Sequence, residues 1–249
     1  RKMIASGFQN IGQKFILLSE TIGRAVLLVR STTYWCFHAR LEVRQTLNQI
    51  VRIGVDSFSV TVMTSVFTGM VMALQTGSSF KNLFNEPLFT GTIVAFAMVK
   101  ELGPVMTALV VSGRAGAAIA AEIGTMKVTE QIDALYTLGT DPVRYLVIPR
   151  VLAFVIVLPI LSIFSDYAGI LGGCVVSYLK LEVPTNVYWE EVFNHLEIEQ
   201  FVHGLSKTFV FALCIAFISC YKGLQTEGGA EGVGKSTTSA VVVSMVSVL

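Results

Sequence analysis

Charged residues are scarce in this sequence. They make up 14% of its 249 residues, whereas 53% are hydrophobic and the mean hydropathy is +0.67. Soluble domains carry about 25% charged residues, so the composition argues against a water-soluble fold. The stretch from Ser57 to Phe80 has no charged residue at all, and a helix that crosses a bilayer needs about 20 mainly apolar residues. The sequence therefore predicts an all-α integral membrane protein with several crossings.

The sequence also lacks a large net charge, a secretory signal and metal-ligand spacing. The formal net charge of +1 indicates no nucleic-acid partner. The basic start leads into a long mixed segment, not into a short apolar core with a cleavage site. We expect both ends to be trimmed, because the chain starts at Arg1 and stops at Leu249 inside an apolar run. The cysteines are interpreted as small apolar packing residues: Cys36, Cys174, Cys214 and Cys220.

The first 52 residues form a basic N-terminal region, with eight Lys or Arg against two acids. Within it, residues 15–37 are apolar but interrupted by Glu20, Arg24 and Arg30. Such a segment is typical of a helix that lies in the membrane interface on the cytoplasmic side. A spanning helix of poor quality is the alternative.

Residues 53–249 are predicted to form the transmembrane domain. Its apolar runs predict about five spanning helices, at 54–76, 87–113, 145–180, 201–221 and 237–249, the last one cut short by the end of the chain. A short amphipathic helix is expected at 126–137, and a glycine-rich cytoplasmic turn at 223–236.

The apolar run 145–179 is long enough for two short crossings. As one helix its 35 residues would extend about 52 Å, against about 30 Å for the hydrocarbon core. The distribution of Lys and Arg decides for one crossing, because the loops predicted inside then hold 14 basic residues and the two outside loops hold one each. This topology places the N-terminus inside.

The most distinctive stretches are 100–105, 112–126 and 129–135, followed by 138–142 and 149–153. Small residues recur every four positions in the second of them. This spacing lets helix backbones approach closely in a membrane, so we expect a tight contact, either within the chain or between subunits. The residues concerned are Gly113, Gly116, Ala117, Ala120, Ala121 and Gly124.

This ordered set of motifs resembles the MlaE (YrbE-like) permease family of ABC transporters, from about residue 45 to the end and most strongly over 98–153 and 229–241. The resemblance implies a non-catalytic, homodimeric permease with two copies of a cytoplasmic ATPase, which binds ATP and magnesium in place of this chain. It further implies an outer partner of the mammalian-cell-entry (MCE) type. The implied cargo is phospholipid or a related apolar lipid, moved between the inner membrane and the outer envelope of a double-membraned bacterium. A plastid envelope is the less favoured location.

The resemblance also implies that 126–137 is the coupling helix that docks on the ATPase. The residues agree with an amphipathic helix, with an apolar face and polar neighbours. Such a face needs a cover, either a partner protein, which the resemblance favours, or the lipid surface. The residues assigned to coupling are Val128, Glu130, Gln131, Ile132, Asp133 and Leu135.

Glu101 is a candidate for the lipid pathway near the dimer interface, since ionisable groups inside a membrane segment are costly and usually face a partner or a cavity. Local neutralisation by Lys100 is the alternative. Large apolar residues are candidates for the wall of the lipid cavity, although similar residues also face bulk lipid: Phe67, Met70, Leu74 and Phe96.

Other polar features are given structural interpretations. Arg114 and Glu122 bracket the small-residue helix at the cytoplasmic boundary, and Asp166 marks a kink or an outer cavity. Residues 229–236 match the phosphate-loop pattern but lie between apolar helices with no strand before them. We therefore expect a turn there and no nucleotide site.

Two other classes of membrane protein fit the sequence less well than a permease subunit. A stand-alone secondary transporter or channel is expected to show internal repeats or broken helices around an ion site, and no repeat is apparent. A membrane-bound lipid enzyme needs clustered catalytic side chains, whereas His38, His195 and His203 are scattered. The permease interpretation is preferred.

Overall fold

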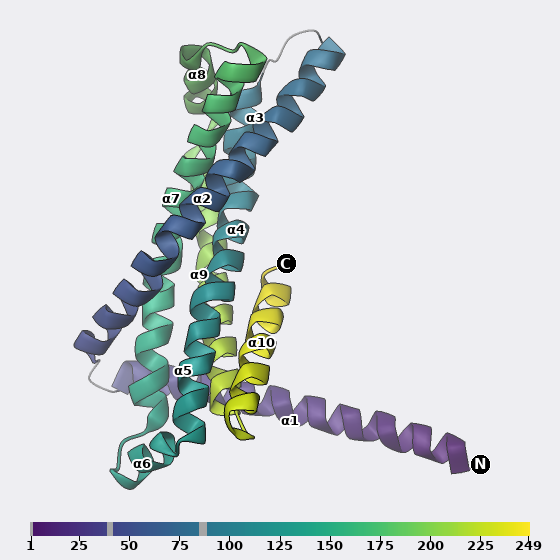
Figure 1. The fold of residues 1–249 in the computed structure, drawn as a ribbon, viewed down its shortest axis with the longest axis vertical. Coiled ribbons are helices and arrows are strands. Elements are labelled where there is room, and N and C mark those ends of the chain that lie inside the picture. The colour runs from purple at the N-terminus through teal and green to yellow at the C-terminus, as the bar shows by residue number, and fades with distance from the viewer. Residues whose placement is uncertain (1, 39–41, 85–88) are drawn as a thin grey trace.

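The chain folds into a bundle of long helices, with one further helix lying across its lower end (Figure 1). The computed structural model describes residues 2–38, 42–84 and 89–249. Within these ranges every regular element is a helix, which confirms the predicted all-α fold. Helices α6 and α8 mark opposite ends of the bundle, which we call the α6 end and the α8 end.

The helices are α1 (Lys2–His38), α2 (Val43–Phe84), α3 (Thr90–Ala97), α4 (Gly103–Val111), α5 (Ala117–Val128), α6 (Gln131–Thr137), α7 (Ile148–Leu181), α8 (Thr185–His195), α9 (Ile198–Leu224) and α10 (Gly229–Val248). Three π-helical segments join some of them: η1 (Met98–Leu102), η2 (Ser112–Gly116) and η3 (Val143–Val147).

Four helical stretches in the described residues are long and apolar enough to cross a membrane: Val43–Lys81, Thr90–Val128, Val143–Leu181 and Ile198–Leu224. Each overlaps one of the first four predicted spans and extends beyond it. The run 145–180 lies within one continuous helical stretch, as predicted, because α7 continues through Pro159. The fifth predicted span falls on the second half of α10, which is not among the four. Residue 52, the predicted end of the N-terminal region, lies inside α2.

The prediction of a glycine-rich turn over 223–236 is wrong for its second half, because α10 begins at Gly229. Gly228 and Gly229 have φ angles of 85° and 69°, a region that glycine enters without a Cβ clash, so these two residues make the turn. Glu231 and Lys235 then pair one helical turn apart at 2.7 Å. The residues that match the phosphate-loop pattern are thus helical and not a loop.

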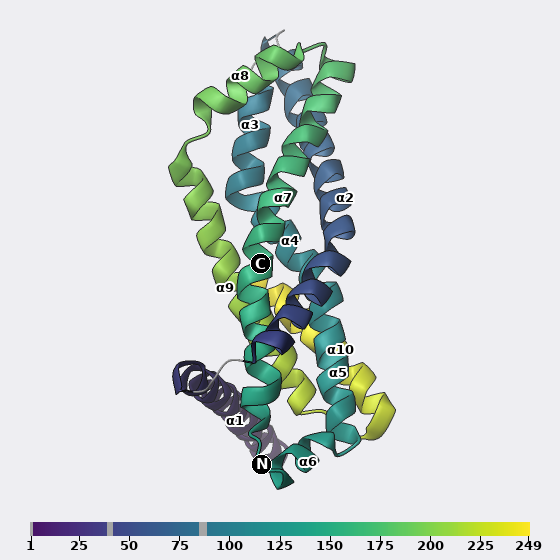
Figure 2. The same cartoon turned by 90° about the vertical axis from the view of Figure 1, so that its left-hand side faces the viewer.

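Helices α3, α4 and α5 follow one another as a continuous rod, with η1 and η2 as π-helical turns within it (Figures 1 and 2). Pro104 follows η1 and has no N–H to donate to the carbonyl of Lys100. The Nζ atom of Lys207, on α9, donates to this carbonyl at 3.1 Å. A side chain from another helix therefore occupies the acceptor that the proline leaves open.

The α8 end is held by two side chains of α8. The Glu191 carboxylate accepts hydrogen bonds from the backbone N–H groups of Phe89 and Gly91, at 3.2 and 2.9 Å. These N–H groups lie at the start of α3, where a negative charge is favourable. Tyr188 is fully buried and donates from its hydroxyl to the carbonyl of Ile170 at 3.1 Å. Burial raises the pKa of this hydroxyl, so it stays protonated as the donor.

Helix α7 lies within the bundle and packs on α2, α4 and α9 (Figure 2). Glycines allow α2 and α7 to cross with their backbones in contact. A Cβ added at Gly69 would overlap the carbonyl of Gly169, and one added at Gly172 would overlap the carbonyl of Val66. Hydrophobicity does not drive helices together in lipid, so this close approach is what makes the contact favourable.

We expect Gly172→Ala to lower the free energy of unfolding by about 1–3 kcal/mol, because the added methyl group forces the two helices apart. Thermal unfolding in detergent measures this change. Gly234→Ala is the matched control, since Gly234 is also helical and has no atom near the position of an added Cβ. This control is expected to be neutral or to stabilise the protein by up to about 1 kcal/mol. Equal effects of the two substitutions would contradict the close crossing.

Candidate functional site

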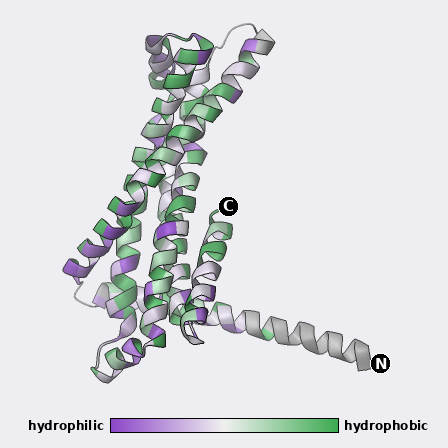
Figure 3. Ribbon diagram, in the orientation of Figure 1, coloured by the Kyte–Doolittle hydropathy of each residue, from purple (hydrophilic) through white to green (hydrophobic). Residues whose placement is uncertain are grey.

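Several polar side chains that connect different helices lie in the α6 half of the bundle. The α6 end is formed by α6, the adjoining ends of α5 and η3, and α1, which lies across it (Figures 1 and 2). In Figure 3, hydrophilic residues mark the start of α2 and the region around α6, next to the more hydrophobic middle of the bundle. This end is the one that the sequence predicts to face the cytoplasm.

The amphipathic segment is divided differently from the prediction. Instead of one helix over 126–137, α5 runs to Val128 and α6 starts at Gln131. The two are joined by a turn in which Glu130 has a φ of 60°, the left-handed region that non-glycine residues rarely adopt. Lys127 bridges this turn with an ion pair to Asp133 at 3.1 Å.

The apolar face of α6 is covered by the chain itself. Ile132 is 3% exposed and belongs to the buried core, and Leu135 packs against that core. Val128 is half-buried. For Ile132, the expectation that this face needs a partner or lipid as its cover is therefore wrong, because its side chain is buried in the chain's own core.

The exposed surface of α6 consists of other residues. Glu130, Gln131 and Asp133 are exposed, as an outward-facing polar side requires. Beside them, Tyr136 is 62% exposed and Leu138 is 78% exposed. The prediction missed these two, although Tyr136 lies within the predicted amphipathic segment and Leu138 directly follows it. An exposed apolar pair rimmed by charged residues is typical of a protein contact surface.

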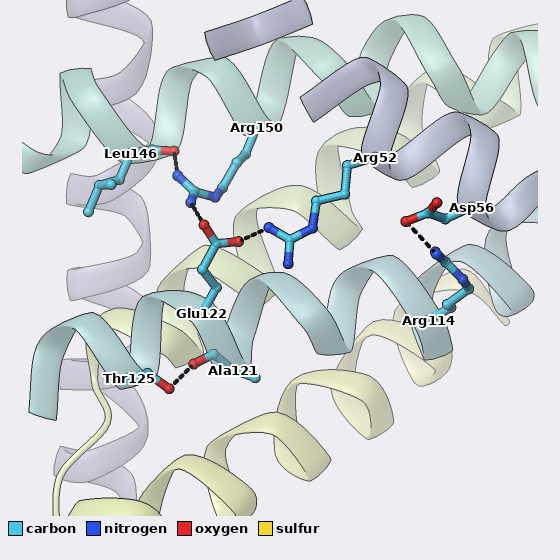
Figure 4. A network of polar contacts seen from close by, with 8 residues as sticks. All are labelled: Arg52, Asp56, Arg114, Ala121, Glu122, Thr125, Leu146 and Arg150. Carbon is cyan, nitrogen blue, oxygen red and sulfur yellow. Dashed lines mark hydrogen bonds and ion pairs between the residues drawn. The ribbon is translucent and has the colours of Figure 1, made fainter. Parts of the chain in front are cut away.

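Above α6, three helices are connected by one carboxylate (Figure 4). Glu122 on α5 accepts from Arg150 on α7 at 2.8 Å and from Arg52 on α2 at 2.7 Å. The Arg150 side chain is 5% exposed and also donates to the carbonyl of Leu146 at 2.6 Å. A buried guanidinium is costly without a counter-charge, so Glu122 is what permits Arg150 to be inside the bundle.

A second ion pair lies beside this network. Arg114 in η2 contacts Asp56 on α2 at 2.9 Å (Figure 4). It also donates to the Ser57 hydroxyl at 3.4 Å. Arg114 and Glu122 therefore both bind α2, which agrees with the structural role predicted for them at the end of the small-residue helix.

Helix α1 is attached to the bundle by contacts at Trp35 and at Thr21. The indole N–H of Trp35 donates to Asp141 at 2.8 Å, while the other carboxylate oxygen of Asp141 accepts from the N–H of Val143 at 2.8 Å. Arg144 lies over the Trp35 ring, 6.0 Å from its centroid. Farther along α1, the carbonyl of Thr21 accepts from the hydroxyl of Tyr221 at 2.9 Å. The carboxylate of Asp141 thus binds both the first N–H group of η3 and the Trp35 indole of α1.

The small-residue face packs within the chain at several of its positions. An added Cβ would contact Met245 of α10 at Gly113, Ser219 of α9 at Gly116, and Thr226 just after α9 at Gly124. These contacts favour the alternative of intrachain packing for this side of the helix. In the single chain, Ala120 is fully buried, whereas Ala117 and Ala121 are half-buried.

The structure separates the lipid-pathway candidates into two groups. Phe67, Met70 and Leu74 lie on α2, with Phe67 56% and Leu74 41% exposed. Phe96 lies instead beside Lys100, whose ammonium is 4.8 Å from the centre of its ring.

The second group, Phe96 and Glu101, lies near the start of α9. Phe96 and Lys100 border a pocket together with α9 residues that include Glu199 and His203. Glu101 pairs with Lys207 of α9 at 2.6 Å. Local neutralisation of Glu101 by Lys100 is therefore wrong, because Lys207, brought close by the fold, is its partner.

Asp166 is 5% exposed and lies against Gly103, where an added Cβ would overlap its carboxylate. This position is inside the bundle and not in an outer cavity, and α7 continues as a helix through it. Among the described residues, no group of three or more His, Cys, Asp or Glu side chains is placed to hold a metal ion.

Comparison with known proteins gives a consistent result. The family described as Permease MlaE matches residues 46–249. A probable ABC transporter permease protein from Rickettsia felis is 40% identical over 99% of this chain and 95% of its own length. One from Rickettsia prowazekii is 46% identical over 96% and 92%, and one from Pyropia yezoensis is 40% identical over 89% and 82%.

We expect Glu122→Gln to lower the free energy of unfolding by about 3 kcal/mol, because it leaves the buried Arg150 without a counter-charge. Breaking a buried ion pair costs about 3–5 kcal/mol, and we expect the lower figure here because the Glu122 side chain is 30% exposed. Denaturant unfolding in detergent measures the change. Glu231→Gln, which removes an ion pair between two side chains that are 77% and 80% exposed, is expected to have little effect. A Glu122 variant as stable as this control would show that the network contributes nothing.

We expect Trp35→Phe and Asp141→Asn to loosen α1 to the same extent. The asparagine oxygen still accepts from Val143, but its amide group cannot accept from the Trp35 indole. Hydrogen exchange of α1 residues 19–38 measures the loosening, with Glu20→Gln, which breaks an ion pair within α1, as the control. The double variant is expected to match either single one, because both remove the same bond. Additive effects would mean that the two residues act separately.

Proposed function

Because the chain belongs to the MlaE permease family, we propose that it is the membrane-spanning subunit of an ABC transporter that moves phospholipid or a related apolar lipid. The observation that carries this proposal is the combination of four bundle helices able to span a membrane with an exposed α6 surface at one end. The chain has no catalytic role in this proposal. Hydrolysis of ATP, with its magnesium ion, belongs to a separate cytoplasmic subunit.

The full assembly in this proposal is a homodimer of the chain with two ATPase subunits at the α6 end and an MCE-type protein at the α8 end. The location that follows from the family is the inner membrane of a double-membraned bacterium, from which lipid is exchanged with the outer envelope. The names of the similar proteins, all probable ABC transporter permease proteins, support the ATPase partner. The lipid cargo and the outer partner rest on the family resemblance.

Coupling to the ATPase is assigned to the exposed side of α6. Glu130, Gln131 and Asp133 provide charge and hydrogen-bonding groups, while Tyr136 and Leu138 provide exposed apolar contact. Large, exposed apolar side chains within a polar rim are the usual centre of a protein interface.

Movement of α6 is transmitted to the bundle by the residues that face inward. Ile132 and Leu135 pack into the core that also contains Ile123 of α5 and Phe154 of α7. Closure of the ATPase subunits would therefore displace the ends of α5 and α7 together with α6. Close-packed interiors transmit such displacements because they have little free volume.

The lipid pathway in this proposal involves two surfaces. One is the apolar side of α2 that carries Phe67, Met70 and Leu74. The other is the pocket beside Phe96, next to which Glu101 and Lys207 form an ion pair inside the spanning region. Charged pairs at such a depth are usually retained for function, because placing them in hydrocarbon is costly.

The proposal predicts that Leu138→Ser weakens binding of the ATPase subunit by about tenfold, because a large apolar contact is lost. The chain is co-expressed with a candidate ABC ATPase, and copurification and lipid-dependent ATP hydrolysis in a reconstituted bilayer are measured. Leu135 is a poor choice for this test, since its replacement would also disturb the core. Phe193→Ser on α8 is the matched control, because Phe193 is 74% exposed at the opposite end.

Loss of hydrolysis with Leu138→Ser but not with Phe193→Ser supports coupling at α6. Equal effects of the two substitutions would place the coupling surface elsewhere. If the wild-type chain moves lipid without any ATPase, the permease proposal fails and a stand-alone secondary transporter replaces it.

A further inference from the structure

A polar cleft between α2 and the η2–α5 segment has no role in the function proposed so far. Its volume is about 280 Å³. Its polar wall is formed by Gln49, Arg52 and Asp56 on α2 and by Arg114 in η2, over an apolar floor that includes Ile53 and Ile119. Arg52, Asp56 and Arg114 are three of the residues drawn in Figure 4.

The charges around the cleft do not cancel. Arg52, Arg114 and Arg150 carry three positive charges, and Asp56 and Glu122 carry two negative ones, so one positive charge remains in the network. A guanidinium has five N–H donors. Arg52 uses one of its terminal nitrogens for Glu122, and the Arg52 side chain is still 54% exposed. Donors and charge are therefore available to a singly charged anion.

The cleft also contains an unused acceptor. The side-chain oxygen of Gln49 is buried and has no hydrogen-bond partner within the described part of the chain. Burying such a group without a partner is unfavourable. A ligand that carries a hydroxyl or ammonium group beside its anionic group would supply the missing donor.

The position of the cleft along α2 indicates a lipid. Asp56 is the last charged residue before the uncharged stretch from Ser57 to Phe80. A helix enters the hydrocarbon core where its charged residues end, so the cleft is at the level of lipid headgroups. Anionic phosphates are concentrated there, and arginine binds phosphate well because its planar fork donates two hydrogen bonds at once.

An apolar surface continues from the cleft along the same side of α2. Exposed apolar residues follow Arg52 and Asp56 at helical spacing of three or four, so they lie on one face. They reach well into the uncharged stretch, and acyl chains are the partner that such a surface fits. The residues are Val60, Met63, Phe67, Val71 and Leu74, which are 41–62% exposed.

We propose that this cleft binds the phosphodiester headgroup of a phospholipid from the leaflet at the α6 end, with an acyl chain along the exposed face of α2. The inference rests on the proposed function and adds to it a recognition site for a phosphate-bearing lipid. Arg52 and Arg114 bind the phosphate, and Asp56 limits the affinity for an anion because it occupies Arg114 and adds a negative charge.

The test measures lipid binding to the full chain in detergent by native mass spectrometry. Three probes separate the contributions of headgroup and chains. Dioleoylphosphatidylglycerol has both, dioleoylglycerol has the chains without phosphate, and glycerol phosphate has the headgroup chemistry without chains. Wild type is expected to bind phosphatidylglycerol more tightly than either of the other two.

Two substitutions are expected to change this affinity in opposite directions. Arg114→Gln removes a charged donor and should weaken phosphatidylglycerol binding by about tenfold. Asp56→Asn frees Arg114 and should strengthen it. Neither should change the binding of dioleoylglycerol. Loss of the fold would weaken binding in both variants, so the opposite signs separate recognition from misfolding. The matched controls are Arg24→Gln and Glu20→Gln, which break an exposed Arg–Glu pair on α1 and should change nothing.

Three outcomes would overturn the proposal. Equal affinities for phosphatidylglycerol and dioleoylglycerol would mean that the phosphate is not recognised. Equal affinities for phosphatidylglycerol and glycerol phosphate would identify a site for a soluble anion. A shift of Arg114→Gln from dimer to monomer without a change in lipid binding would mean that a second copy of the chain covers this face.

Lipid-stimulated ATP hydrolysis by the complex with the ATPase separates this proposal from the function on which it rests. If lipid stimulates the wild-type complex but Arg114→Gln binds phosphatidylglycerol as wild type does, the cleft proposal fails and the permease function stands. If no lipid stimulates the wild-type complex, the proposed function fails, whatever the cleft binds.

Discussion

The carboxylate of Glu122 is the interaction on which the α6 half of the bundle depends. It is bound by arginines from two other helices, Arg150 and Arg52, and one of these is buried. Without it, Arg150 would be an uncompensated charge inside an apolar core, an arrangement that costs several kcal/mol. The presence of Arg150 in the core depends on this contact, which also connects α2 to α5 beside the Arg114–Asp56 pair.

Next to this network, two segments that are far apart in the sequence share one anchor. Asp141 caps η3 with one oxygen and holds the indole of Trp35 with the other. Helix α6 immediately precedes this cap, and its inner residues are part of the core that η3 and α7 complete. The helix that lies across the bundle and the proposed docking helix are therefore attached to the same short stretch of chain.

The sequence was sufficient to predict the all-α membrane fold and four helical stretches able to cross a membrane, because uncharged apolar runs have few other stable arrangements. It was not sufficient to predict where the helices end. Polar residues such as Arg44 and Gln45 continue α2 below its apolar part, and Gly232 and Gly234 are helical despite their composition. Apolarity determines what crosses the membrane, whereas helix length depends also on contacts outside it.

The candidate site was predicted only in part, for a related physical reason. A periodic pattern shows that α6 has an apolar face, but not that Ile132 on this face is buried in the chain's own core. Likewise, Glu101 looked paired with its neighbour Lys100, although its partner Lys207 is on another helix. Contacts of this kind depend on the tertiary arrangement, which local spacing does not contain.

The two halves of the bundle also differ in the kind of contact that joins α2 to α7. At the crossing of α2 and α7, the backbones touch at Gly69 and Gly172, so any separation loses the contact outright. In the α6 half, the same two helices are also connected through Arg52 and Arg150, which both bind Glu122, besides direct packing such as that of Gly54 near Val157. A displacement that begins at α6 therefore reaches the ion-pair network before it reaches the glycine crossing. The cleft between α2 and the η2–α5 segment shares Arg52 with the ion-pair network, so a change in the angle between α2 and α5 would alter its width.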